Sequence, residues 1–173
     1  MPLLDLRDEM HTLDFVELRI LDDRIRAWGT PRYHSEMAAG VDLLACTDEP
    51  LVLEPQAAAV LVPSGVSIHI GNPLVAGIIV PRSGLGHKQG LVLGNSTGVL
   101  DADFTGELMI SCWNRSRPGS SPVVIDPGDR IAQLLFVPIL RPEIRVVDDF
   151  SRTTGRAGGG FGSTGHAQAL GSS

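Results

Sequence analysis

Three short stretches of the chain combine glycine with groups that bind anions. They are Pro81–Gly86 (PRSGLG), Gly94–Gly98 (GNSTG) and Pro127–Arg130 (PGDR). Each follows a run of apolar residues and places a polar or cationic group beside a glycine that lets the backbone approach a ligand. Backbone N–H groups, a serine hydroxyl and a guanidinium are donors that polyphosphate oxygens accept. Taken singly, each stretch is also typical of a β-turn with a solvated arginine, and the P-loop pattern GxxxxGK(S/T) does not occur.

Two carboxylates, Asp101 and Asp103, stand between the second stretch and the next apolar run. Carboxylates at this spacing could ligate a metal, act as a general base with a partner, or serve as ordinary turn acids, which is the default reading. The histidines show neither HxxxH nor HxxE spacing, and GxSxG does not occur, so a zinc hydrolase and a serine triad are disfavoured. The five histidines are His11, His34, His69, His87 and His166.

The elements that carry these residues are short apolar runs between about Phe15 and Phe150, bounded by Gly, Pro, Asn or Asp. Several are rich in Val and Ile, and the run Val66–Ile70 alternates strictly, which predicts a strand with one face in solvent. No stretch keeps a helical period for three turns. We therefore expect an all-β domain over 15–150, built as a sandwich or a distorted barrel. The runs are Phe15–Leu21, Val41–Ala45, Ala57–Val62, Val66–Ile70, Leu74–Val80, Leu108–Trp113, Val123–Ile125 and Ile131–Val137.

The two ends of the chain differ in composition from this domain. Residues 1–14 mix leucine with acids at no clear period, and we interpret them as an N-terminal extension. Residues 151–173 are rich in Ser, Thr, Gly and Arg, with four glycines around a single aromatic ring, Phe161. This composition is typical of a disordered terminus, although Arg156 and Phe161 would also suit a segment that folds over a ligand.

Composition and charge disfavour several classes of function. The 173 residues fit one compact domain, and 43% hydrophobic residues argue against wholesale disorder. A net charge of −6 and 5% aromatic residues disfavour nucleic-acid binding, which needs basic and stacking surfaces. The acidic N-terminus is unlike a signal peptide, and the apolar stretch Ile131–Leu140 is too short for a membrane span. With Cys46 and Cys112 interpreted as buried free thiols, we expect a soluble cytoplasmic protein without nucleic-acid or membrane partners.

Five stretches of the sequence resemble, in order, the five motifs of the trimeric dUTP diphosphatase (dUTPase) family. The resemblance runs from about Phe15 to Gly165, and an ordered match to five motifs is far more specific than any one of them. It implies a distorted jelly-roll-like β-barrel, a homotrimer with active sites shared between subunits, and a mobile C-terminal tail over 151–173 that carries the fifth motif. The five stretches are Ala39–Leu43, Pro81–Leu85, Gly98–Glu107, Gly128–Gln133 and Arg156–Gly165.

The resemblance also implies a reaction, the hydrolysis of dUTP to dUMP and pyrophosphate, which lowers dUTP and supplies dUMP for thymidylate synthesis. Asp101 would orient and deprotonate the water that attacks the α-phosphorus in line, a role that suits a carboxylate. The cofactor Mg²⁺ would be carried by the substrate triphosphate and water without a direct protein ligand, with Asp42 as an outer-shell partner.

By the same resemblance, further residues bind the substrate. Those expected at the phosphates are Arg82, Ser83, Gly84, Arg130 and Gln133. Those expected to read uracil, chiefly through their backbone, are Asn95, Gly98, Val99, Leu100, Asp101 and Met109. Phe104 stands where the family usually has tyrosine, so it keeps the ring beneath the deoxyribose and loses the hydroxyl. The fifth motif would supply Arg156 at the γ-phosphate, Phe161 over the uracil, and Gly162 and Ser163 as further substrate contacts.

Two rival functions stay open at this point. dCTP deaminases share the fold, but their catalytic glutamate would fall at Ser111 here, and their chains usually lack a glycine-rich tail. A non-catalytic nucleotide-sensing module on the same fold is the other alternative, because a fold does not fix a function. The fifth motif also departs from the family at Ala157 and Gly158, which predicts looser or differently timed closure of the tail.

Overall fold

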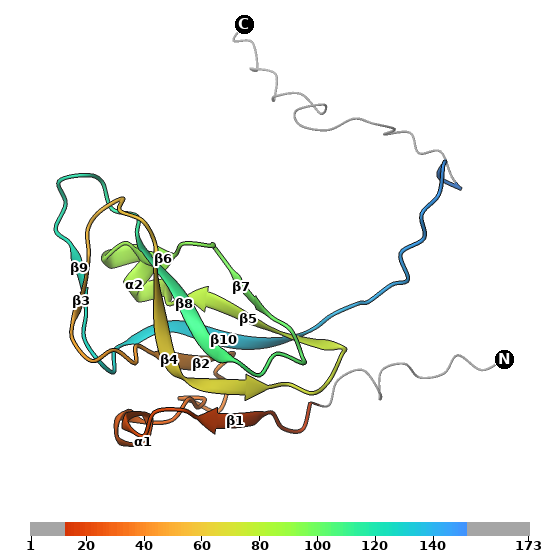
Figure 1. The fold of residues 1–173 in the computed structure, drawn as a ribbon, viewed down its shortest axis with the longest axis horizontal. Helices are drawn as coiled ribbons and strands as arrows, with labels where there is room; N and C mark the ends of the chain where they lie inside the picture. The colour runs from red at the N-terminus through yellow and green to blue at the C-terminus, as the bar shows by residue number, and fades with distance from the viewer. Residues whose placement is uncertain (1–12, 152–173) are drawn as a thin grey trace, which may run out of the picture. The chain divides into compact units, whose positions relative to one another are not determined.

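The computed structural model describes residues 13–151 of the chain. By their contacts the residues form two compact units, 1–141 and 142–173, which we treat separately. The first unit holds the strands and helices (Figure 1). In the second, residues 142–151 contain no helix or strand, and Arg145 pairs with Glu143 at 2.7 Å. The roles predicted for 1–14 and 151–173 concern residues that lie almost entirely outside the described range.

The described residues confirm the all-β prediction. Their strands pair antiparallel in two four-stranded sheets, ordered β1-β4-β8-β6 and β2-β10-β5-β7, and in a small sheet, β3-β9. Two short helices lie between strands in this part of the chain. In chain order the elements are β1 Glu17–Ile20, α1 Arg24–Trp28, β2 Val41–Leu44, β3 Leu51–Leu53, β4 Val60–His69, β5 Val75–Pro81, α2 Ser83–Lys88, β6 Leu91–Leu93, β7 Gly98–Leu100, β8 Glu107–Asn114, β9 Val123–Ile125 and β10 Arg130–Pro138.

Both larger sheets contribute to one hydrophobic core. Strand β8 shows how the sequence builds it, because Leu108, Ile110 and Cys112 are buried while Met109 between them is exposed, the period of two expected of a strand. The two cysteines are buried and free, as predicted, and burial raises the pKa of the Cys112 thiol to about 12. No helix within residues 13–151 has the length and apolar character needed to cross a membrane.

Strand β4 differs from the sequence prediction of two separate runs with one solvent-facing side. It is one strand, and its pairing with β8 shifts register between Pro63 and Ser67. The irregularity contains Gly65, whose φ of 69° favours glycine. A Cβ at Gly65 would lie 2.8 Å from both Cys46 Sγ and Ile25 Cγ1. Ser67, predicted on the solvent face, is 5% exposed because it faces the turn that leads into β8.

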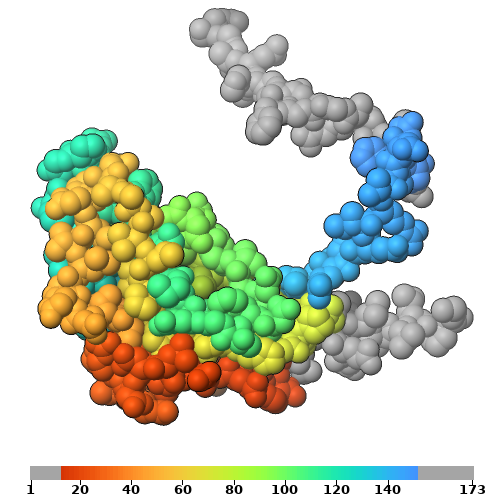
Figure 2. Space-filling model, in the orientation of Figure 1, coloured from red at the N-terminus to blue at the C-terminus, as the bar shows by residue number. Residues whose placement is uncertain are grey.

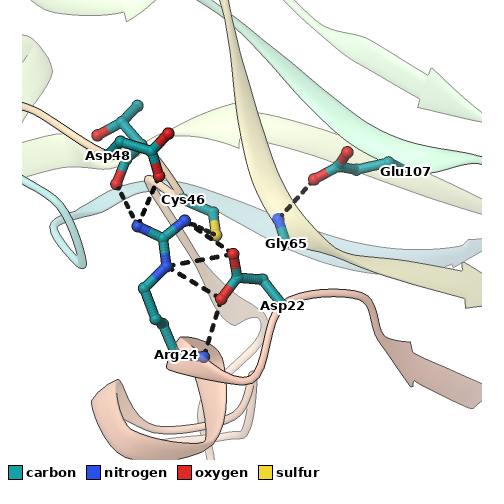
Figure 3. A network of polar contacts seen from close by, with 7 residues as sticks. Asp22, Arg24, Cys46, Asp48, Gly65 and Glu107 are labelled. Carbon is teal, nitrogen blue, oxygen red and sulfur yellow. Dashed lines mark hydrogen bonds and ion pairs between the residues drawn. The ribbon is translucent and has the colours of Figure 1, made fainter.

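A polar network holds helix α1 against this irregularity (Figure 3). Arg24 pairs with Asp22 at 2.7 Å and with Asp48 at 3.0 Å, and it lowers the pKa of the Asp22 carboxyl well below its usual range through their hydrogen bonds. Burial raises the pKa of the nearby Cys46 thiol. On the other side of Gly65, its N–H donates to Glu107 Oε1 at 2.9 Å (Figure 3). The conformation at Gly65 therefore fixes where β8 begins.

Replacing Gly65 with alanine is expected to destabilise the fold. The left-handed φ and the overlap with Cys46 and Ile25 should together lower the free energy of unfolding by about 2–4 kcal/mol. Gly119→Ala is the matched control, since Gly119 has φ 84° with no atom within 4 Å of its Cβ position, and should cost about 1 kcal/mol. Denaturant unfolding of both variants at one protein concentration measures the difference, and equal losses would show that the packing around Gly65 does not matter.

Candidate functional site

A buried carboxylate organises one end of the sheet β2-β10-β5. Asp42 on β2 stands opposite Gln133 on β10, and Gln133 in turn stands opposite Val80 near the end of β5. Asp42 is 6% exposed. Its Oδ1 lies 3.0 Å from Arg82 Nε and accepts from Gln133 Nε2 at 3.3 Å, and its Oδ2 accepts from Arg130 Nη1 at 3.4 Å. The structure thus brings together four residues predicted from three separate stretches of sequence.

The charges of this cluster favour an anion as ligand. One carboxylate faces two guanidinium groups, so the Asp42, Arg82 and Arg130 side chains together carry a net positive charge. The side chains of Arg82 and Arg130 are 30% and 48% exposed, so both guanidinium groups reach solvent. Arg82 is also held by a hydrogen bond from its Nη1 to the Arg130 carbonyl at 3.3 Å. A buried acceptor that fixes guanidinium groups in place prepares them to bind phosphate oxygens.

A pocket of about 230 Å³ opens beside the cluster. Its lining residues are Arg82, Ser83, Gly84, Leu85, Lys88, Gln89 and Gln133. No atom lies within 4 Å of the Cβ position at Gly84, so the backbone there is open to a ligand. The sequence predicted a turn in this region, whereas residues Ser83–Lys88 form helix α2. A helix this short completes less than two turns, too few for its period to be read from sequence.

Two residues of this region were missed by the sequence analysis. Lys88 lines the pocket from α2, and its signal was a cation five residues after Ser83. His34 lies before β2, and its Nε2 is 3.4 Å from Asp42 Oδ2, the oxygen that also contacts Arg130. No spacing in the sequence connects His34 to the other residues of the cluster.

The stretch Gly94–Thr97 connects the two large sheets, because β6 pairs with β8 while β7 pairs with β5. A Cβ at Gly94 would overlap Ala59 and lie 2.8 Å from Ser111 Oγ, so only glycine fits. Asn95 and Val99 are exposed, as expected of residues that read a base. Predicted uracil contacts on this connection and the next strand also include Gly98, which is partly exposed, Met109, which is exposed, and Leu100, which is buried and so offers only its backbone.

Asp101 and Phe104 stand on one turn after β7. The Phe104 N–H donates to the Asp101 carbonyl at 3.2 Å. Asp101 and Asp103 both line a cavity of about 470 Å³, together with His69 and Arg141. The Phe104 side chain is 42% exposed, and its ring lies over Gly106, where a Cβ would come within 2.7 Å of ring Cζ. In the space-filling view the segment 94–106 (green) lies at the surface (Figure 2).

Asp101 lies far from the arginine cluster of its own chain. Leu100 pairs with Gly77 on β5, so Asp101 is level with Ala76, and Arg82 follows six residues further along (Figure 1). At about 3.3 Å per residue this separation is on the order of 20 Å, much longer than a triphosphate. One chain therefore presents the predicted base and the predicted phosphate donors at two separate places.

The remaining predicted residues are not placed by the structure. Arg156, Phe161, Gly162 and Ser163 lie outside the described residues. Within residues 13–151, no group of three or more His, Cys, Asp or Glu side chains is arranged to hold a metal ion. Both oxygens of Asp42 already contact cationic or amide groups, so this residue has no vacant position for direct coordination of a metal.

These features match a known family. A family model described as dUTPase matches residues 26–165, a range that includes the Asp42 cluster, the Gly94–Thr97 connection and the Asp101 turn. The chain belongs to the dUTPase family. Two relatives named deoxyuridine 5'-triphosphate nucleotidohydrolase, from Shewanella pealeana and Paraburkholderia xenovorans, are 50% and 52% identical to this dUTPase. The matches cover 87% of this chain in both cases, and 96% and 97% of the relatives.

Solved structures agree with this assignment. A dUTPase of Staphylococcus bacteriophage 80alpha with the nucleotide dUpNHpp is 26% identical, with a TM-score of 0.72 over 88% of this chain and 99% of that one. A mutant dUTPase from phage phi11 of S. aureus, described as showing the coordination of a structural Mg(II) ion, has a TM-score of 0.68 at 26% identity over 80% of this chain and 100% of that one. The jelly-roll-like fold and the family inferred from the five motifs are thereby confirmed.

Family membership also decides between the rival readings. The relatives carry the name of a dUTP-hydrolysing enzyme, so this dUTPase is an enzyme of the dUTP diphosphatase type. Ser111, where a deaminase would carry its glutamate, has no carboxylate. Its backbone carbonyl instead accepts from the Gly94 N–H at 2.8 Å and supports the connection between the sheets.

Proposed function

We propose that this dUTPase hydrolyses dUTP to dUMP and pyrophosphate. The observation that carries the proposal is the Arg82, Arg130 and Gln133 cluster around buried Asp42, beside the open backbone at Gly84. This arrangement is built for several phosphate oxygens at once, and its members come from positions up to 91 residues apart. The names of the relatives supply the base and the sugar of the substrate.

Asp101 is proposed as the general base. It would accept a proton from a water molecule whose oxygen bonds to the α-phosphorus. The bond from that phosphorus to the oxygen bridging to the β-phosphate would break, and pyrophosphate would leave with the electron pair. Negative charge on the phosphoryl oxygens would be stabilised by Arg82, Gln133 and the backbone at Gly84, with Ser83 and Arg130 in support.

Mg²⁺ is proposed to bind through the triphosphate rather than through this chain. The residues around Asp42 suit this arrangement, because the nearby guanidinium groups would repel a bare cation but attract the anionic oxygens of the magnesium–nucleotide complex. Mg²⁺ usually keeps several waters, so Asp42 could contact it only through one of them. When bound, the ion would neutralise charge on the phosphates.

Recognition of uracil and deoxyribose is assigned to the β6–β8 region. Backbone groups of Gly98, Val99 and Leu100, with Asn95 and the Met109 backbone, would pair with the edge of uracil and leave buried groups unpaired when cytosine binds. The exposed Phe104 ring would stand beneath the deoxyribose and overlap a 2′-hydroxyl. The fifth motif, with Arg156, Phe161, Gly162 and Ser163, is proposed to close over the nucleotide.

A homotrimer with shared sites follows as a proposal from the separation of Asp101 and Arg82. One chain places them on the order of 20 Å apart, so a single nucleotide can meet both only when Asp101 of one chain approaches Arg82 of another. Exposed apolar side chains such as Leu61, at 63%, and Val99, at 69%, offer surface for such contacts. A cytoplasmic location, and a metabolic role in lowering dUTP and supplying dUMP, complete the proposal.

Pyrophosphate release from dUTP, dCTP, dTTP and UTP in the presence of Mg²⁺, with ammonia measured in parallel, tests this function. We expect kcat/KM for dUTP to exceed that for dCTP by about 10⁴-fold, because a backbone pattern made for uracil rejects the wrong pairing edge. Ammonia from dCTP would indicate a deaminase. Nucleotide binding without release of either product would indicate a sensing module, and both results contradict the proposal.

A further inference from the structure

The turn that carries Asp101 and Phe104 is held in place by a single strand and the residues after it. Ser67 Oγ on β4 donates to the Thr105 carbonyl at 2.7 Å. The Gly71 N–H, just beyond β4, donates to the Ala102 carbonyl at 2.9 Å. The Gly65 N–H donates to Glu107 at 2.9 Å (Figure 3). These contacts are spread along residues 102–107, so β4 determines where the whole turn lies.

Ser67 is the one side-chain donor among these three contacts. It reaches the turn because the register shift in β4 sets four residue steps, from Pro63 to Ser67, against two on β8, from Met109 to Glu107. Ser67 stands opposite Glu107, where pairing resumes, and is 5% exposed. A buried hydroxyl that bonds a carbonyl across the sheet restricts the backbone more than an exposed one, because water cannot replace it.

The Phe104 ring depends on such backbone contacts. A phenylalanine has no hydroxyl with which to fix its ring, so its position follows from packing and from the backbone on either side. On one side the Phe104 N–H is bonded to the Asp101 carbonyl, and on the other the Thr105 carbonyl is bonded to Ser67. Beneath the ring, Gly106 leaves no space for a Cβ.

We propose that Ser67 is a positioning residue that fixes the Phe104 ring and thereby determines how strictly the enzyme prefers deoxyribose to ribose. The inference rests on the proposed function. Exclusion of a 2′-hydroxyl by a ring is a matter of overlap, and overlap is relieved when the ring moves by a fraction of its own thickness. Losing the Ser67 hydroxyl frees the Thr105 carbonyl, so the turn can move away from the sugar and admit a ribonucleotide.

The test compares kcat/KM for dUTP with kcat/KM for UTP in four proteins, namely the wild type, Ser67→Ala, Ser67→Thr and Ser64→Ala. We expect Ser67→Ala to lower the dUTP/UTP ratio about fivefold, the change that corresponds to one hydrogen bond, chiefly by raising kcat/KM for UTP. Ser67→Thr keeps a hydroxyl and should retain the ratio within about twofold. Ser64→Ala is the matched control, because Ser64 is equally buried on β4 but bonds only within the strand, to Val66 at 3.4 Å.

The outcomes separate positioning from simple stability. A Ser67→Ala protein that melts earlier but keeps the wild-type ratio would overturn the inference, as would an equal fall of the ratio in Ser64→Ala. If Ser67→Ala does not fold, Ser67→Cys, which keeps only a weak donor of similar size, should show the lowered ratio instead, and an unchanged ratio there would overturn it equally. A wild-type protein that does not hydrolyse dUTP would overturn the proposed function itself, and the inference with it.

Discussion

Asp101→Asn is expected to lower kcat for dUTP by about 10³-fold or more while the nucleotide still binds. Asparagine has nearly the shape of aspartate but cannot accept the proton of the attacking water, and a positioned general base contributes about 10²–10⁴-fold. Because the chemical step alone is lost, the Kd for the analogue dUpNHpp should stay within about threefold of the wild type. Single-turnover hydrolysis of dUTP and calorimetric titration with the analogue measure the two quantities separately.

Asp103→Asn is the matched control for this prediction. Asp103 lies two residues away, is exposed, and lines the same cavity of about 470 Å³, so its substitution changes the local charge by the same amount. We expect it to retain kcat within about fivefold, because the proposed base is untouched. If Asp101→Asn kept more than about a tenth of the activity while Asp103→Asn lost it, the base would have to be reassigned to Asp103.

The strands could be predicted because their signal is local. Runs rich in Val and Ile alternate with a period of two, and β8 shows that alternation directly in its buried and exposed residues. Helix α2 could not be predicted in the same way, since six residues that include two glycines give neither a helical period nor favourable propensity. The single strand β4 was divided in two because Gly65 reads as a turn, whereas its positive φ forms an irregularity inside the strand.

The site was predictable to the extent that motifs carried it. Residues of the Asp42 cluster were named from the sequence, but their mutual contacts depend on the register of β2, β10 and β5, which no local pattern specifies. His34 contacts Asp42 from a loop whose sequence has no motif, so it was missed. The burial of Ser67 was predicted wrongly, because alternation indicates which face a side chain occupies but not what covers that face.

Two inactive variants are expected to restore activity to each other if sites are shared between chains. Asp101→Asn removes the proposed base and Arg82→Ala removes a proposed phosphate donor, and the register separates these residues by on the order of 20 Å in one chain. Each variant alone should be nearly inactive. After the two are unfolded and refolded together at equal concentration, random trimers would have a complete site wherever an intact Asp101 meets an intact Arg82 from a neighbour, which is roughly one quarter of all sites.

A second mixture distinguishes shared sites from sites within one chain. When wild type is co-refolded with the double variant Asp101→Asn/Arg82→Ala, shared sites leave roughly one quarter of sites complete, whereas sites built within one chain leave roughly one half. The single-variant mixture would then give no complete site at all. Native mass spectrometry confirms that mixed trimers have formed, and the same proteins combined without unfolding show the background. Mixed trimers that stay inactive in the first mixture and keep half the activity in the second would refute sharing, because only a base and a donor from the same chain produce that pair of results.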